Sequence, residues 1–148
     1  MSVTDGRTAQ AAAKLMSLLD DGGYTCVLSN GSNTVTSTER GVLPLIRSIR
    51  SGADYRGYAA ADKVVGKAAA LLYAYMGVAE LSAHVISERA VEVCARFGIA
   101  VRYESVVPRI INRKGDGDCP MEQAVKDVDN PSAAVEVVTE KLKAMGLL

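Results

Sequence analysis

Three short segments carry polar or reactive residues at points where helices are expected to begin. Asp62 and Lys63 stand before a long apolar run, Ser87 stands between two apolar runs, and Cys119 precedes Pro120. Asp and Ser are good helix N-caps, and the unpaired N–H groups of a first helical turn attract anions and polar groups. Each segment could therefore cap its own helix or contact a ligand.

The segment Cys119-Pro120-Met121-Glu122 has the form of a helix start. Pro120 suits the first helical position, and Glu122 stands third, as in a capping box. Cys119 would then lie at the positive end of the helix dipole, close to Arg113, and both features favour the thiolate form. A reactive or substrate-contacting thiol is one interpretation. A structural turn in which Cys119 fills space is the more common arrangement.

Parallel strand–helix–strand units place successive helix N-termini at the same end of a sheet, where ligands of α/β proteins bind. We therefore expect one polar pocket at that end of the sheet. The alternative is three separate helix caps with no shared cavity. The predicted pocket residues are Asp62, Lys63, Ser87, Arg113, Cys119 and Glu122.

Metal ligands are scarce. His84 is the only histidine and falls in a predicted strand, so a structural role is favoured over a catalytic one. The loop 112–118 alternates Asp and Gly, but Asp127 stands where a calcium loop starting at Asp116 needs a bidentate Glu. We predict no metal site and no cofactor.

Hydrophobic periodicity alternates between helix and strand. An Asn30-Gly31 hairpin follows a first helix, strands are expected over 57–61, 79–86 and 99–103, and helices over 63–76 and after Ser87. Residues 109–111 could form a last strand, with two helices after it. The sequence therefore predicts an α/β fold, a three-layer α-β-α sandwich with a mixed sheet, in one domain spanning residues 1–148.

The long central helix is apolar nearly all round, which is typical of a helix buried on several sides. We expect one core between the sheet and its helices. Its predicted members include Val65, Ala69, Leu72, Val85 and Val91.

The chain holds 17 basic and 17 acidic residues, so its formal charge is zero. This balance argues against nucleic-acid binding by phosphate neutralisation and against a polybasic membrane anchor. Residues 1–10 have no signal-peptide character, and three dispersed cysteines favour reduced thiols in a cytoplasmic protein. The sequence leaves a homo-oligomer open.

The element order, together with residues 62–70, 85–87, 112–113 and 119–122, resembles an uncharacterised bacterial and archaeal family with a cytidine-deaminase-like fold, catalogued as a domain of unknown function. The resemblance covers about Tyr24 to Val125. Zinc deaminases need His or Cys ligands at two helix starts and a Glu beside the first of them. Positions 62–64 and 87–90 hold none of the ligands, and the Glu is missing from its usual place. The resemblance thus implies a zinc-free scaffold without the deaminase reaction.

Two classes of function remain. The first is a small-ligand binding or regulatory module, whose ligand is nucleotide-like by fold analogy alone. The second is an enzyme of unassigned class that uses Cys119 or Asp62. The first is favoured because no nucleophile–base–orienter set is visible in the sequence.

Overall fold

A computed structural model describes residues 6–148 as a five-stranded sheet flanked by helices. Residues 1–5, on which part of the signal-peptide expectation rests, lie outside the described residues. The helices are α1 (Gly6–Asp21), α2 (Leu43–Arg50), α3 (Lys67–Met76), α4 (Glu88–Arg96), α5 (Pro120–Ala124) and α6 (Pro131–Ala144). The strands are β1 (Cys26–Ser29), β2 (Thr34–Ser37), β3 (Ala59–Val65), β4 (Glu80–Ser87) and β5 (Ala100–Val107).

The sheet is mixed, as predicted. Its strand order is β2-β1-β3-β4-β5, with β1 antiparallel to both β2 and β3, and with β3, β4 and β5 parallel. The hairpin β1–β2 forms where Asn30-Gly31 indicated, although its loop spans residues 30–33. The two crossovers through α3 and α4 are the predicted parallel units, so the α/β fold is confirmed.

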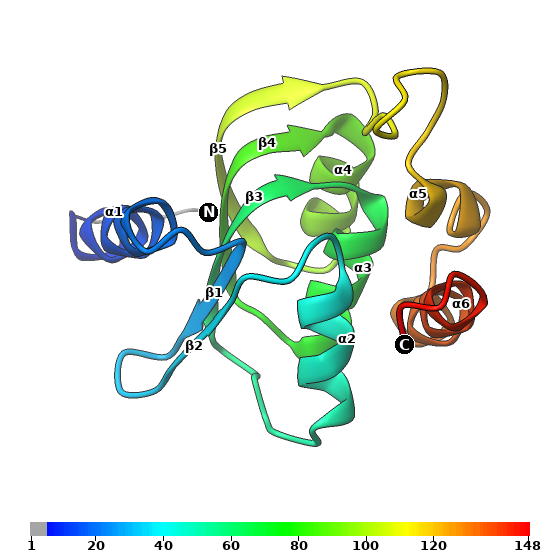
Figure 1. The fold of residues 1–148 in the computed structure, drawn as a ribbon. Helices are drawn as coiled ribbons and strands as arrows, with labels where there is room; N and C mark the ends of the chain where they lie inside the picture. The colour runs from blue at the N-terminus through cyan, green and yellow to red at the C-terminus, as the bar shows by residue number, and fades with distance from the viewer. Residues whose placement is uncertain (1–5) are drawn as a thin grey trace.

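Helices cover both faces of the sheet (Figure 1). Helix α1 lies on one face, whereas α2, α3 and α4 lie on the other, and α5 and α6 pack outside α3. Because α3 is enclosed between the sheet and α6, its residues from Lys67 to Tyr73 are all buried. This enclosure explains why the α3 sequence is apolar nearly all round.

The main core lies between the sheet and α3. Val65, Ala69 and Leu72 belong to it, and the half-buried Val91 packs against it, as predicted. Val85 does not belong to this core. Ala83 and Ile86 both face the core although they are three residues apart, so strict alternation breaks at His84 and Val85. A smaller cluster of Leu19, Val27 and Ala61 lies under α1.

Several element boundaries differ from the predictions. Helix α3 begins at Lys67 with Gly66 as its N-cap, so the prediction that Asp62 caps this helix was wrong. Strand β3 continues through Asp62 to Val65, since it pairs with β4 along that length. Residues 109–111 form no strand, and only an isolated bridge joins Ile111 to Asp118. No helix within residues 6–148 is long and apolar enough to cross a membrane.

Candidate functional site

A cleft of about 980 Å³ lies between three segments that are far apart in the sequence. One wall is the segment 38–43 that leads into α2. The second wall comes from residues 110–121, which connect β5 to α5, and the third from the end of α6 and the residues after it, 142–147. This volume is typical of sites for metabolite-sized ligands.

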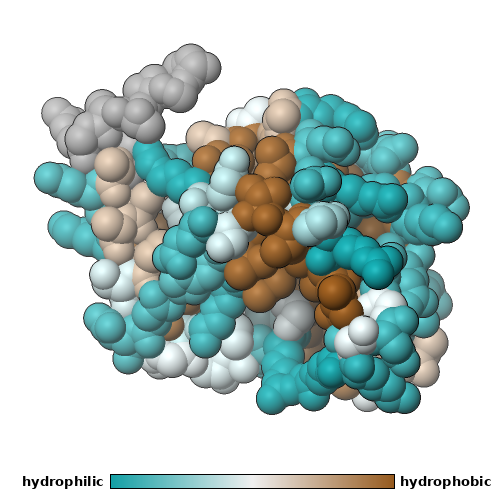
Figure 2. Space-filling model, turned by 90° about the horizontal axis from the view of Figure 1, so that it is seen from above, coloured by the Kyte–Doolittle hydropathy of each residue, from teal (hydrophilic) through white to brown (hydrophobic). Residues whose placement is uncertain are grey.

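The cleft walls are mainly apolar, with cationic side chains among them. Val42, Leu43, Met121 and Leu142 are among the apolar wall residues. Figure 2 shows the molecule from above the view of Figure 1, and apolar side chains gather across the middle of that face. Ile111, which is 51% exposed, belongs to the cleft lining. The cleft therefore offers an apolar surface to the uncharged part of a ligand.

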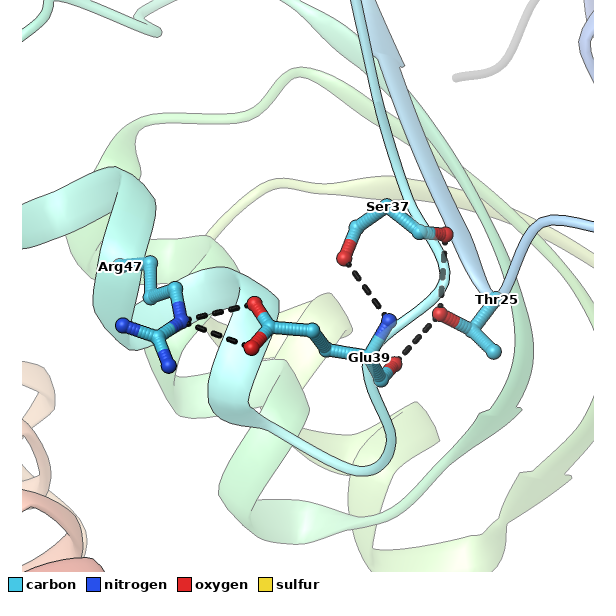
Figure 3. A network of polar contacts seen from close by, with 4 residues as sticks. All are labelled: Thr25, Ser37, Glu39 and Arg47. Atoms are coloured by element: carbon cyan, nitrogen blue, oxygen red, sulfur yellow. Dashed lines mark hydrogen bonds and ion pairs between the residues drawn. The ribbon is translucent and has the colours of Figure 1, made fainter. Parts of the chain in front are cut away.

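A polar network holds the first wall in place (Figure 3). The hydroxyl of Thr25 donates to the carbonyls of Ser37 and Glu39, and the Ser37 hydroxyl accepts the Glu39 N–H at 3.1 Å. The Glu39 carboxylate accepts from Arg47 Nε of α2 at 2.7 and 2.9 Å. The network ties the segment 38–43 to Thr25, which directly precedes β1, to Ser37 of β2 and to Arg47 of α2.

Positive charge is in excess along the cleft. Arg40, Arg113 and Lys114 line it, and in the region that the structure describes none of the three forms an ion pair. Of the carboxylates in the walls, Glu39 is paired with Arg47, and Asp116 accepts a hydrogen bond from Asn112 at 2.9 Å. The cleft therefore favours a ligand with an anionic group.

Cys119 lies in the cleft wall, half-buried, at the N-cap position of α5. Its side chain makes no capping hydrogen bond. The predicted capping box is absent because Glu122 points elsewhere. Of the six residues predicted to share one pocket, Arg113 and Cys119 line the cleft, and the other four are not in its walls.

Glu122 reaches across to the start of α3. Its two carboxylate oxygens accept the backbone N–H groups of Lys67 at 2.8 Å and Ala68 at 2.9 Å. The Lys67 ammonium group, largely buried, donates to the Lys126 carbonyl at 3.1 Å and pairs with Asp129 at 3.2 Å. The first turn of α3 is therefore occupied by the protein's own groups and docks the segment around α5.

Asp62 belongs to a buried polar network inside the core. The Tyr73 hydroxyl donates to Asp62 Oδ2 at 2.7 Å and lies 3.4 Å from the Cys26 thiol. Burial raises the pKa of Asp62 to about 7, although the hydrogen bond from Tyr73 opposes the rise. Burial likewise raises the pKa of Cys26 to about 12. The network stabilises the join between β1, β3 and α3 and does not open into the cleft.

Ser87 caps α4 as predicted. Its hydroxyl accepts the Ala90 N–H at 3.1 Å, and the residue is buried. Lys63 is exposed on β3. Lys63 is exposed to solvent, whereas Asp62 and Ser87 are buried inside the protein. The structure therefore does not gather these three residues around one cavity.

His84 is a half-exposed structural histidine. Its Nε2 lies 2.7 Å from Asp20 of α1, and its Nδ1 lies 2.9 Å from Glu104 of β5. The hydrogen bond with Asp20 raises the pKa of His84. Within residues 6–148 no group of three His, Cys, Asp or Glu side chains is placed to hold a metal ion.

Two walls of the cleft were not predicted from the sequence. The segment 38–43 reads as a short connection before a helix, and Leu142 and Met145 read as part of the apolar face of a terminal helix. One signal was available in the sequence, the pair Arg40-Gly41, in which a cation stands beside a glycine. In the structure Gly41 adopts a φ of 63°. Nothing in the sequence indicated that these segments meet residues 110–121.

The fold and its cleft define an α/β protein with a mixed sheet and a site sized for a metabolite. The chain belongs to the TM1506 family, described as a domain of unknown function (DUF1893), whose profile matches residues 14–142. The resemblance to an uncharacterised family is thereby confirmed, and the match extends beyond the 24–125 region. No protein of curated function matches the chain.

Solved structures agree with this assignment. A DUF1893 family protein (TM1506) from Thermotoga maritima superimposes with a TM-score of 0.81 at 24% identity, over 94% of this chain and 92% of that chain. Structures of dCMP deaminase from the cyanophage S-TIM5, in apo form and with dCMP and dUMP, give TM-scores of 0.45. Their identities are 11% and 10%, over 68% of this chain and 99% of theirs. The likeness to deaminases is thus the weaker one.

Proposed function

We propose that this protein binds a small molecule with an anionic group and an apolar or planar body, such as a nucleotide, in the cleft between residues 38–43, 110–121 and 142–147. The observation that carries the proposal is the cleft itself. It is metabolite-sized, its walls are largely apolar, and Arg40, Arg113 and Lys114 line it without carboxylate partners in the described part of the chain.

Cationic and apolar residues of the cleft would contact different parts of the ligand. Arg113 and Lys114 on the connection after β5, and Arg40 on the opposite wall, would pair with phosphate or carboxylate oxygens. The apolar residues of α6 and α5 would contact the uncharged part of the ligand. Because the Glu39–Arg47 ion pair already holds one wall in place, binding requires little further ordering of that wall.

Thermal unfolding tests the proposal. A panel of nucleoside mono- and diphosphates should raise the unfolding temperature, whereas the matching uncharged nucleosides should not, because ligand binding stabilises only the folded state. Arg113→Gln should remove most of the shift. Arg50→Gln is the matched control, since Arg50 is exposed at the end of α2 and does not line the cleft. Equal shifts in both variants, or none with any anionic ligand, would reject the proposal.

A second candidate is an enzyme that uses Cys119 as a nucleophile on the bound ligand. Its support is the position of the thiol in the cleft wall. Asp62 is a poorer candidate because it is buried in the core, apart from the cleft. Cys119→Ser should then keep ligand-induced stabilisation and lose any turnover of the ligand. Turnover that survives in this variant would exclude the thiol.

We also propose a cytoplasmic location, because Cys26 and Cys94 are buried free thiols suited to a reducing compartment. Fractionation of the native host cell tests this, and recovery outside the cytoplasm would contradict it.

A further inference from the structure

Strand β5 forms one border of the sheet. It pairs with β4 alone among the described strands, and no helix or strand follows beyond it in Figure 1. Much of its length is solvent-exposed, with Tyr103 at 46% and Val106 at 42%. Natural edge strands are usually protected by charged side chains, above all lysine, by proline or by a bulge. Ala100–Val107 contains neither lysine nor proline.

The hydrogen-bonding groups on the outer edge of β5 can be assigned from its pairing. The Ala100 N–H donates to the Ala79 carbonyl at 3.0 Å, so the peptide groups of Ala100 face β4. Successive residues of a strand turn their N–H and C=O groups to opposite sides. The groups of Val101, Tyr103 and Ser105 therefore face outward, where they can pair with another strand.

These outward groups are symmetric about Tyr103. In an antiparallel pair of identical strands related by a two-fold axis at Tyr103, this residue would pair with its own copy. Val101 would then exchange hydrogen bonds with Ser105 of the copy. Arg102 and Glu104 would face each other across the axis as non-hydrogen-bonded partners, whose side chains lie closest.

The charges fit this arrangement. Arg102 forms no ion pair in the described part of the chain, while Glu104 is 67% exposed and contacts His84 at 2.9 Å. Two-fold pairing about Tyr103 would bring Arg102 of each copy against Glu104 of the other, giving two opposite-charge pairs. Shifting the register by two residues separates the two charges.

We propose that the protein forms a symmetric dimer through β5, in which two copies join into a continuous ten-stranded sheet with the two-fold axis at Tyr103. The occupant of the β5 edge is a second copy of this chain, because the outward hydrogen-bonding groups and the charges of this strand are complementary to themselves. The cleft lies outside this surface, so the inference is independent of the proposed ligand.

Sedimentation equilibrium on the full chain tests the dimer. The native protein should fit a monomer–dimer model. Arg102→Glu should raise the dimer dissociation constant about tenfold or more, because it places like charges opposite each other twice. The double variant Arg102→Glu with Glu104→Arg should restore it to within about threefold of the native value. A structural defect in the single variant would not be rescued in this way.

The variant Tyr103→Pro provides a second test of the proposed dimer. It removes an N–H that faces outward and leaves the pairing with β4 in place, so the variant should be a folded monomer by circular dichroism and sedimentation. Arg50→Gln on α2 should sediment like the native protein. A native chain that is monomeric at every concentration would overturn the proposal. So would a dimer that keeps its dissociation constant in Arg102→Glu.

Discussion

The carboxylate of Glu122 fills the place that a side chain on Gly66 would need. A Cβ at Gly66 would lie 2.6 Å from the carboxyl carbon of Glu122, and the same carboxylate accepts the N–H groups of Lys67 and Ala68. The glycine is required by this close approach, since its φ of −102° is open to any residue. A residue of α5 thus caps a helix that lies 55 positions earlier in the chain.

Glu122→Ala should lower the free energy of unfolding by about 1–3 kcal/mol, because two N–H groups lose a charged acceptor. Gly66→Ala should cost a similar amount, since the new methyl group must displace the same carboxylate. Chemical denaturation of both single variants and of the double variant checks this. The two costs should be strongly non-additive, because both substitutions remove one contact. Glu136→Ala, at an exposed position of α6, should have no measurable effect.

A second prediction concerns pH. Asp62 has a folded-state pKa of about 7, against an ordinary value of 3.8, so the unfolded chain releases this proton first as pH rises. The folded state binds more protons between these values, and its stability therefore falls from about pH 4 to about pH 7. The loss from Asp62 is on the order of 4 kcal/mol at most.

Asp62→Asn removes this contribution while keeping an oxygen acceptor for the Tyr73 hydroxyl. Urea unfolding from pH 4 to pH 8 should show the native protein losing stability relative to the variant as pH rises. Titration of His84 is common to both proteins and cancels in the difference. Curves that stay parallel across this range would contradict the burial of an uncharged Asp62.

Local sequence patterns predicted the sheet and its crossovers well, because hydrophobic periodicity reports which faces are buried. Ser87 was correctly expected to cap a helix, since its cap is closed by a residue three positions away. Asp62 was misassigned for the opposite reason. Its partner is Tyr73, eleven residues later, and nothing local distinguishes a capping aspartate from one buried against a tyrosine.

The candidate site was predicted only in part for the same physical reason. Arg113 and Cys119 both lie on the connection between β5 and α5, and the local sequence of that connection was enough to predict them. The walls opposite them come from residues 38–43 and 142–147, and these are brought together by the packing of α2 and α6. Glu122 was expected at a ligand site, whereas its carboxylate accepts a backbone N–H group at the N-terminus of α3. Long-range contacts of this kind leave no spacing pattern in the sequence.

A third prediction tests the core between the sheet and α3. Leu72 is fully buried, so Leu72→Ala should lower the free energy of unfolding by about 2–5 kcal/mol through lost burial and a residual cavity. Leu18→Ala on α1 is the matched control, since Leu18 is 38% exposed. Its cost should be well below that of Leu72→Ala. Denaturant midpoints at constant m-value provide the measurement.

The last prediction concerns thiol reactivity. Iodoacetamide should modify Cys119 first in the folded protein, because this thiol is half-buried in the cleft wall, whereas Cys26 and Cys94 are buried. Burial raises the pKa of Cys26 to about 12 and that of Cys94 to about 11, so both remain protonated at neutral pH, and only the thiolate attacks. Peptide mapping after brief alkylation identifies the modified residue.

Cys119→Ser should then be unreactive when folded and should take up two labels in denaturant, one at each remaining cysteine. A nucleotide that occupies the cleft should slow the alkylation of Cys119 in the native protein. Labelling of Cys26 or Cys94 at a comparable rate would show that the core opens on the timescale of the reaction and that the buried network around Asp62 is less stable than its geometry indicates.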